Sequence, residues 1–203
     1  MLNRQDESFA RFERELALHT SPAMLGAKPA NLITLREDGF VSENISRFNS
    51  RAKEKRLSLR ELCRRDGRVL VMLCNDRLLE KQLCDSEVSG MFKRFGYGSC
   101  CGLCDYIARL SGRISGCGDF PHEIGLFLGY PTGDVKAFIE HKGRDCKLCG
   151  VWKVYTDVDS ARRTFRRYDN CRRYVLSMLD RGQDIFTVLR LGQDSGSQTI
   201  RRN

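Results

Sequence analysis

Two pairs of cysteines with CxxC spacing are the residues of this chain that point most directly to chemistry. They are Cys101 with Cys104 and Cys146 with Cys149. Each CxxC loop lets two thiolates reach one metal ion, so the four thiols together could close a tetrahedral zinc or iron site. That site requires folding to bring two loops together that are far apart in the sequence. The alternative is that Cys104 and its neighbour Cys100 are small apolar residues packed on a helix.

The second pair also suits thiol-redox chemistry. Cys146 and Cys149 lie in a polar loop beside Lys142, Arg144 and Lys147, where accessible thiols are expected. Nearby cations stabilise the thiolate, which is the form that reacts or binds a metal. We therefore expect the function of this protein to be centred on the CKLC loop, as a metal-binding or a thiol-redox protein. The alternative is that both thiols are packed structural residues.

A cysteine–histidine pair is the third chemical possibility. Cys149 would be the nucleophile of a hydrolase and His122 or His141 its base, with Glu123 next to His122. The other interpretation is structural: His122 caps an apolar segment and His141 is an exposed residue in the last turn of a helix, where a cation is favoured. The catalytic candidates are His122, Glu123 and Cys149, and whether the protein is an enzyme stays open.

A stripe of arginines suggests a different class of function, the binding of an acidic partner. The formal net charge of +9 favours such a partner. On one helix the arginines could neutralise several phosphates of a nucleic acid or nucleotide, or the carboxylates of an acidic protein. The alternative is a solvated helix face, diluted by intervening aspartates. The six residues are Arg162, Arg163, Arg166, Arg167, Arg172 and Arg173.

Composition and the N-terminal segment limit the setting in which this chemistry occurs. At 203 residues the chain is long enough to fold without disulfides or metal. It starts with charged residues and contains no apolar stretch long enough to span a bilayer, so we expect a cytoplasmic protein with no membrane partner. Its 10 cysteines are then expected to be free thiols, metal ligands or redox pairs, because the cytosol is reducing.

The elements that must position these residues follow from the apolar pattern. It predicts one α/β domain over residues 1–191 and a disordered tail at 192–203. A long amphipathic helix is expected near 157–181, because its apolar residues recur every three or four positions. The remaining core should be a sheet of about four strands flanked by helices, with strands near 31–35, 69–74, 123–130 and 151–155.

Three local predictions depend on less direct signals. Residues 124–130 are apolar at every position, which predicts a central strand buried on both faces, with Gly125 and Gly129 on the face of Phe127. The sequence Ser-Leu-Arg-Glu at 58–61 has the form of a capping box and predicts the start of a helix. Residues 36–56 are mostly polar and are expected to form a mobile loop.

The chain also resembles a known family. The resemblance is carried by FPHEIGLFLGYP at 120–131, DVKAFIEHKGRDC at 134–146, CGVWKVY at 149–155 and FRRYDNC at 165–171. These segments are similar to the signature of an uncharacterised bacterial family, the domain of unknown function numbered 3793. The resemblance implies an intracellular α/β domain, and it includes the cysteine before Gly-Val-Trp but not the cysteines near residue 101. It assigns no activity and no catalytic residue.

Overall fold

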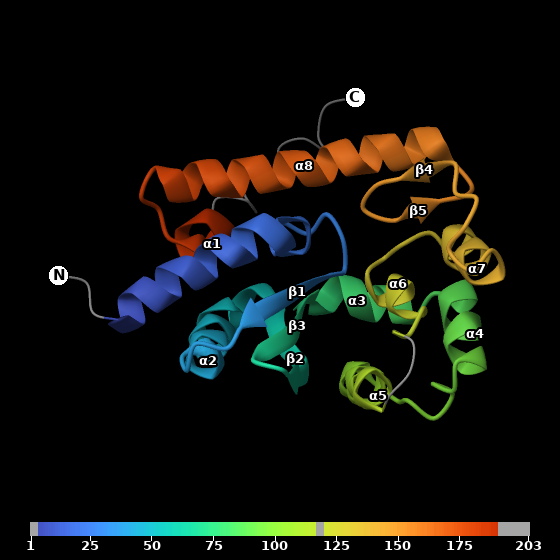
Figure 1. Cartoon of the computed structure of the whole chain (residues 1–203), viewed down its shortest axis with the longest axis horizontal. Helices are drawn as coiled ribbons and strands as arrows, with labels where there is room; N and C mark the ends of the chain where they lie inside the picture. The colour runs from blue at the N-terminus through green and yellow to red at the C-terminus, as the bar shows by residue number, and fades with distance from the viewer. Residues whose placement is uncertain (1–3, 117–119, 191–203) are drawn as a thin grey trace.

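The computed structural model describes residues 4–116 and 120–190 (Figure 1). Its centre is an antiparallel sheet in the order β1-β3-β2, formed by β1 (Ala30–Arg36), β2 (Leu57–Arg65) and β3 (Arg68–Asn75). A separate hairpin pairs β4 (Leu148–Cys149) with β5 (Lys153–Val154). Helices surround both sheets, so the α/β class predicted from the sequence is confirmed. The predicted tail at 192–203 lies outside the described residues.

Strand β3 is central because its side chains are apolar on both faces. Val71, Met72 and Leu73 are all fully buried, and alternate residues of the strand enter two different hydrophobic cores. The prediction of a buried strand at 69–74 is therefore confirmed, as is the prediction of a strand at 31–35, which is part of β1. The strands on either side satisfy the backbone of β3 over its whole length.

The first core lies between one face of the sheet and the two longest helices. These helices are α1 (Arg4–Met24) and α8 (Val158–Asp180), which pack side by side along one edge of the molecule (Figure 1). Helix α2 (Val41–Ala52), the short 3-10 turn η1 (Lys53–Lys55) and the helical residues 185–190 complete this layer. The long C-terminal helix predicted from the 3.6-residue period is confirmed, with Asp157 as its cap.

The second core covers the opposite face of the sheet. It is built from α3 (Asp76–Leu83), α4 (Ser86–Arg94), α5 (Leu103–Ser115) and α6 (Ile124–Phe127). Its centre is a group of aromatic rings packed mostly edge to face around Phe92, which contacts Tyr97, Tyr106 and Phe127. This core holds α6 in place, and α6 is one wall of the site described below.

A third, smaller cluster joins the hairpin to the N-terminal half of α8. It contains Trp152, Val154, Ala161 and Tyr168, with Phe165 packed against it. Helix α7 (Thr132–Glu140) lies on the other side of the hairpin (Figure 1). The hairpin is thus held between α7 and α8.

The predicted central strand at 123–130 is wrong, because this segment is helical. Four residues form α6, and Leu128 N–H donates to the Ile124 carbonyl as in a helix. The segment is buried on all sides, so its apolar run carries no period that would separate a strand from a short helix. Gly129 ends it with φ +72°, and a Cβ there would lie 2.5 Å from Pro29 Cδ.

Two further predictions are corrected by the structure. The segment that begins at Ser58 is strand β2, where the Ser58 hydroxyl donates to Asp76 across the sheet instead of capping a helix. The polar region at 36–56 is not a loop, because it contains α2, which buries Val41 and Phe48. Of the strand predicted at 151–155, residues 153 and 154 form β5 in the separate hairpin.

Candidate functional site

An open groove of about 990 Å³ lies between α6, α7 and the β4–β5 hairpin. Apolar and aromatic side chains make up most of its wall, and a few polar groups converge on it. This composition is typical of sites that bind small molecules. The residues that line the groove are Phe120, Pro121, His122, Ile124, Gly125, Tyr130, Asp134, Val135, Phe138, Ile139, Lys142, Cys149, Gly150, Val151, Trp152 and Lys153.

One carboxylate fixes the hairpin side of the groove to α7. Asp134 is in the first turn of α7, and its Oδ1 accepts hydrogen bonds from Tyr155 N–H, Thr156 N–H and the Thr156 hydroxyl at 2.8–2.9 Å. Its Oδ2 accepts from Trp152 Nε1 at 2.7 Å. Burial opposes ionisation of Asp134, but these hydrogen bonds outweigh it and hold the pKa of the carboxyl below its usual value. Asp134 is therefore a structural anion.

Aromatic packing sets the position of the groove wall on the hairpin. The Trp152 ring stacks on Tyr130 with centroids 5.1 Å apart and meets Phe165 edge to face at 4.6 Å. The Tyr130 hydroxyl donates to the Val151 carbonyl. Gly150 is required at the hairpin turn because a Cβ at this position would lie 2.3 Å from the Phe165 ring. The turn between β4 and β5 is thus held against α8.

The CKLC thiols occupy two different environments. Cys149 is exposed, lies in β4 opposite Lys153 and contributes to the groove wall. Cys146 is partly buried, comes just before the strand and is not part of that wall. The structure therefore places the second thiol of the pair in the groove wall and the first one outside that wall.

The other catalytic candidates also occupy different environments, in the groove wall or in the protein interior. His122 lines the groove with Cys149, and its ring meets Phe138 edge to face at 5.3 Å. Glu123 instead points into the protein, where it is 1% exposed, forms an ion pair with Arg113 and accepts a hydrogen bond from the Tyr97 hydroxyl. Glu123 therefore anchors α6 to the second core. His141 stacks on Tyr155 and is not among the groove residues.

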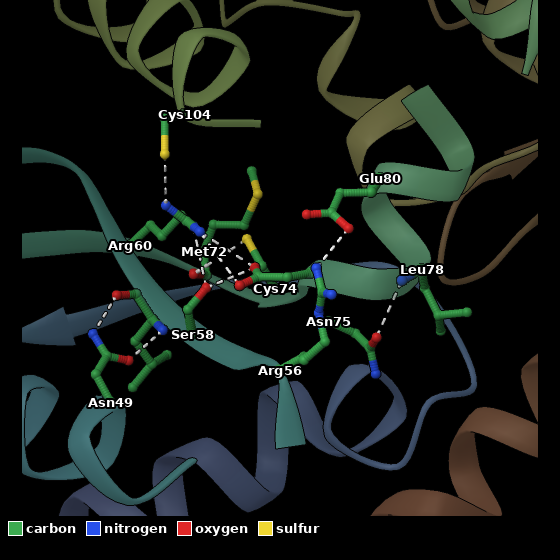
Figure 2. Close-up of polar contacts among 12 residues, drawn as sticks. Asn49, Arg56, Ser58, Arg60, Met72, Cys74, Asn75, Leu78, Glu80 and Cys104 are labelled. Atoms are coloured by element: carbon green, nitrogen blue, oxygen red, sulfur yellow. Dashed lines mark hydrogen bonds and ion pairs between the residues drawn. The ribbon is translucent and has the colours of Figure 1, made fainter. Parts of the chain in front are cut away.

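The other CxxC pair lies at the start of α5. Figure 2 shows Arg60 of β2 extending toward Cys104, and the Nη1 to Sγ distance is 3.8 Å. Arg60 is held in turn by Asp76 and by the Ser58 hydroxyl. Cys101 is exposed, and its backbone N–H donates to Asp105 of α5. Cys104 thus lies against the β2 edge of the sheet.

The structure does not bring the two CxxC pairs together. Among residues 4–116 and 120–190, no group of three or more His, Cys, Asp or Glu side chains is arranged to hold a metal ion. The sequence prediction of a tetrahedral site formed by Cys101, Cys104, Cys146 and Cys149 is therefore not met. The physical reason is that the first pair is fixed at the β2–α5 edge by Arg60, whereas the second belongs to the hairpin between α7 and α8.

The arginine stripe divides into two groups along α8. Arg172 donates to the Leu18 carbonyl of α1 at 2.9 Å, and both Arg172 and Arg173 form ion pairs with Asp169. The other four are exposed, and none of them forms an ion pair with an acidic side chain of the described residues. The unpaired group consists of Arg162, Arg163, Arg166 and Arg167.

Three cations lie near the hairpin, and only Lys142 of them was identified from the sequence, as a cation beside the CKLC loop. Lys142 and Lys153 line the groove, and Lys153 Nζ donates to the Gly143 carbonyl at 2.6 Å. Lys28 is 3% exposed, and its ammonium lies 5.0 Å from the ring centre of Tyr130 and 5.4 Å from that of Tyr168. Burial lowers the pKa of Lys28 to about 7. No pattern in the sequence marks Lys28 or Lys153, because lysine is usually an exposed residue.

Comparison with known proteins places the chain in one family. No curated protein and no solved structure matched it. In the part of the chain that is described, no helix combines the length and the apolar character needed to cross a membrane. Residues 16–189 match the family model described as "Protein of unknown function (DUF3793)". Because the match covers most of the 203 residues, this chain belongs to the DUF3793 family.

Proposed function

We propose that this protein carries out thiol–disulfide exchange, with Cys149 as the attacking thiol and Cys146 as the resolving thiol. The observation that supports this proposal best is the position of Cys149, an exposed thiol in the wall of a groove large enough for a small molecule. Cys146 is three residues away in the same loop and is partly buried. The cytoplasmic location that the sequence predicts would keep such a pair reduced and ready to react.

The proposed reaction has two steps. The Cys149 thiolate attacks one sulfur of a disulfide substrate, so a mixed disulfide forms and the other sulfur leaves as a thiolate. The Cys146 thiolate then attacks Cys149 Sγ, which releases the second substrate thiolate and leaves a Cys146–Cys149 disulfide. The substrate gains two electrons and the protein loses two. A reducing thiol such as glutathione would restore the pair.

The test uses 2,2'-dithiodipyridine, a neutral disulfide, and peptide mass spectrometry of the native protein. The wild type should form the Cys146–Cys149 disulfide, and the Cys146→Ser variant should stop at a mixed disulfide on Cys149. Cys149→Ser should leave Cys146 largely unmodified. Cys84 is exposed but lies at the end of α3, so Cys84→Ser is the matched control and should react like the wild type at the CKLC pair.

A buried thiol gives the baseline for that experiment. Cys74 is fully buried in β3, and burial raises the pKa of its thiol to about 12. Cys149 should react at least about tenfold faster than Cys74. If Cys146 and Cys149 modify as slowly as Cys74 and never pair, the exchange proposal is wrong. If Cys149 forms a stable adduct in the wild type and Cys146 never resolves it, the observation favours the Cys149–His122 hydrolase of the sequence analysis instead.

The second candidate function is binding of an acidic partner on α8. It is favoured by the four exposed arginines that lack an acidic partner in the described part of the chain. Four cations on two adjacent turns of one helix can neutralise several phosphates, or the carboxylates of an acidic surface. Replacing Arg162, Arg163, Arg166 and Arg167 with Ala should lower the affinity for duplex DNA of unrelated sequence.

The salt dependence of binding is the sharper measurement. Each lost phosphate contact should reduce the slope of log affinity against log salt by about 0.9. The control removes the same charge from exposed positions elsewhere, by changing Arg65, Arg68, Lys93 and Arg94 to Ala. Equal losses in the two variants would mean that only net charge matters, and no retention of the wild type would exclude a nucleic-acid partner.

A further inference from the structure

We infer that the groove binds a small molecule with a flat apolar ring and one anionic group, either a carboxylate or a phosphate. The inference names the substrate class of the proposed thiol exchange and to that extent depends on it. The apolar surface and the charges of the groove wall determine the ligand class.

The apolar part of the ligand follows from where apolar surface remains uncovered. Among residues 4–116 and 120–190, the large apolar side chains that are exposed are Phe120, 47% exposed, and Val151, 39% exposed. Both line the groove, and they come from segments that are well separated in the sequence. Phe138 and Trp152 add two aromatic surfaces to the same wall. A flat apolar ring placed here would cover surface that the protein itself leaves in water.

The charge of the ligand follows from an imbalance among the ionisable groups of the wall. Lys142 and Lys153 each contribute a positive charge, whereas Asp134 is the carboxylate of the lining residues. All four hydrogen bonds of Asp134 come from groups of the protein, so its oxygens already have their partners. Lys142 is exposed, and Lys153 donates only to a neutral carbonyl. One uncompensated positive charge favours one anionic group on the ligand.

The sheet register places this charge beside the reactive thiol. Cys149 and Lys153 are direct partners in the β4–β5 ladder. Directly paired residues share a face of the hairpin, with their Cβ atoms about 5 Å apart. A ligand whose anionic group contacts Lys153 therefore lies next to the Cys149 thiol. This arrangement would bring an anionic aromatic disulfide into position for attack.

The size of the groove is compatible with this class of ligand. Ligand sites in proteins range from about 300 to 1,000 Å³, and this groove is at the upper end. It is open to solvent, so it can admit a ring system of two fused rings together with its charged group. Larger ligands can extend past Phe120 and Val151 at the rim.

The probe for the test is 8-anilinonaphthalene-1-sulfonate, an anionic aromatic dye whose fluorescence rises in apolar sites. Reduced wild-type protein should bind it saturably. The Lys142→Met, Lys153→Met double variant should bind it at least tenfold more weakly, because the aliphatic surface is kept and the charges are lost. Lys81→Met, an exposed lysine on α3, is the matched control and should bind like the wild type. Equal thermal melting of the three proteins excludes an effect of partial unfolding.

Competition then identifies the source of the anion. Displacement of the dye by 1-naphthoate, but not by neutral 1-naphthalenemethanol, assigns a carboxylate ligand, whereas displacement by adenosine monophosphate assigns a phosphate. If the double lysine variant binds the dye as tightly as the wild type, the inference is wrong. It is also wrong if neither anion displaces the dye. The dye forms no bond with thiols, so this result is independent of thiol exchange: either proposal can fail while the other is supported.

Discussion

The ammonium group of Lys28 is a buried charge without an acidic partner among the described residues. It is buried between the rings of Tyr130 and Tyr168 and makes no ion pair or hydrogen bond with the described residues. Attraction to two aromatic rings offsets part of the cost of burying a charge, but less than a carboxylate would. The pKa of Lys28 is lowered to about 7 because the two rings do not offset the whole cost of burying the charge.

Replacing Lys28 with Met should therefore stabilise the protein. At pH 7 the unfolded chain holds a proton on Lys28 with a pKa of 10.5, whereas the folded state has a pKa of about 7, so folding opposes protonation. The free energy of unfolding at pH 7 should rise by about 4 kcal/mol in the variant. From pH 7 to 9 the wild type should recover roughly 1 kcal/mol per pH unit relative to the variant, because the folded amine is then mostly neutral and the proton that folding must remove from the unfolded chain is bound less strongly as the pH rises.

Urea denaturation of both proteins at pH 7, 8 and 9 measures this difference. The comparison between variant and wild type cancels the other groups that titrate in this range. Lys81→Met serves as the control, since an exposed lysine should show no dependence of this kind. A destabilised Lys28→Met variant, or a difference that does not change with pH, would mean that the amine is paired in the folded protein.

Individual residues of the site were predictable only where the residue type itself signals chemistry. Cys149 and His122 were selected from the sequence because thiols and imidazoles react, and both lie in the groove. Glu123 was selected for the same reason and proved to be an anchor paired with Arg113. Trp152 and Lys153 line the groove through the register of a short hairpin, which no pattern in the sequence specifies.

At the scale of elements, one side chain of α7 supplies the polar contacts that hold the β4–β5 hairpin on this helix. Its two ladder pairs are too few to be stable alone. The four hydrogen bonds to Asp134 connect both Trp152 and the residues after β5 to the start of α7. The hairpin is therefore a part of the α7 surface rather than an independent sheet.

Replacing Asp134 with Ala should detach the hairpin. Hydrogen bonds to a charged acceptor contribute about 1.5–3 kcal/mol each, and their loss is not additive, so we expect a destabilisation on the order of 3 kcal/mol. The fluorescence of Trp152, the single tryptophan, should shift to the red as the ring becomes exposed. Asp134→Asn retains an oxygen for three of the four donors and should be less destabilised.

The direction of the pKa shift of Asp134 determines how its stabilisation of the folded protein depends on pH. Because the pKa of Asp134 is lowered in the folded protein, the stabilisation is present above its ordinary value of 3.8 and is lost as the pH falls below it. Unchanged tryptophan emission in Asp134→Ala would show that the hairpin is held by aromatic packing alone.

The elements that could be predicted are those whose apolar residues have a period. Helix α8 repeats every three or four residues over six turns, and β3 is a short run that follows the turn at 66–67 and leads directly into α3. Helix α6 could not be recognised, because a segment buried on all sides has no polar face to mark its period. Strand β2 resembled a helix start, since Ser58 and Glu61 have capping-box spacing but pair with Asp76 and Arg64 in the structure.

At the scale of the whole molecule, the three clusters share elements. Strand β3 contributes to the first two cores, Tyr130 contacts the second and third, and α8 contacts the first and third. A molecule linked in this way should unfold in one step. The loss of helix and the exposure of Trp152 should therefore occur at the same urea concentration.

Two substitutions in β3 test this linkage. Met72 and Leu73 are both fully buried but face opposite cores. Met72→Ala and Leu73→Ala should each cost about 2–5 kcal/mol. In both variants, circular dichroism and tryptophan fluorescence should report the same midpoint, even though Trp152 is in neither core. Separate midpoints in either variant would show that the hairpin cluster unfolds on its own.

The packing of α8 on α1 also determines when the chain can fold during synthesis. Arg172 donates to the Leu18 carbonyl, and the Ile185 N–H donates to Glu13, so contacts that complete the first core join residues 154 and 172 positions apart. At about 5–20 residues per second, α1 leaves the ribosome on the order of ten seconds before α8. During that interval the apolar stripe of α1 that includes Phe12 and Leu16 lacks part of its cover. The nascent chain should therefore be a substrate for chaperones that bind exposed apolar helices, until its last helix emerges.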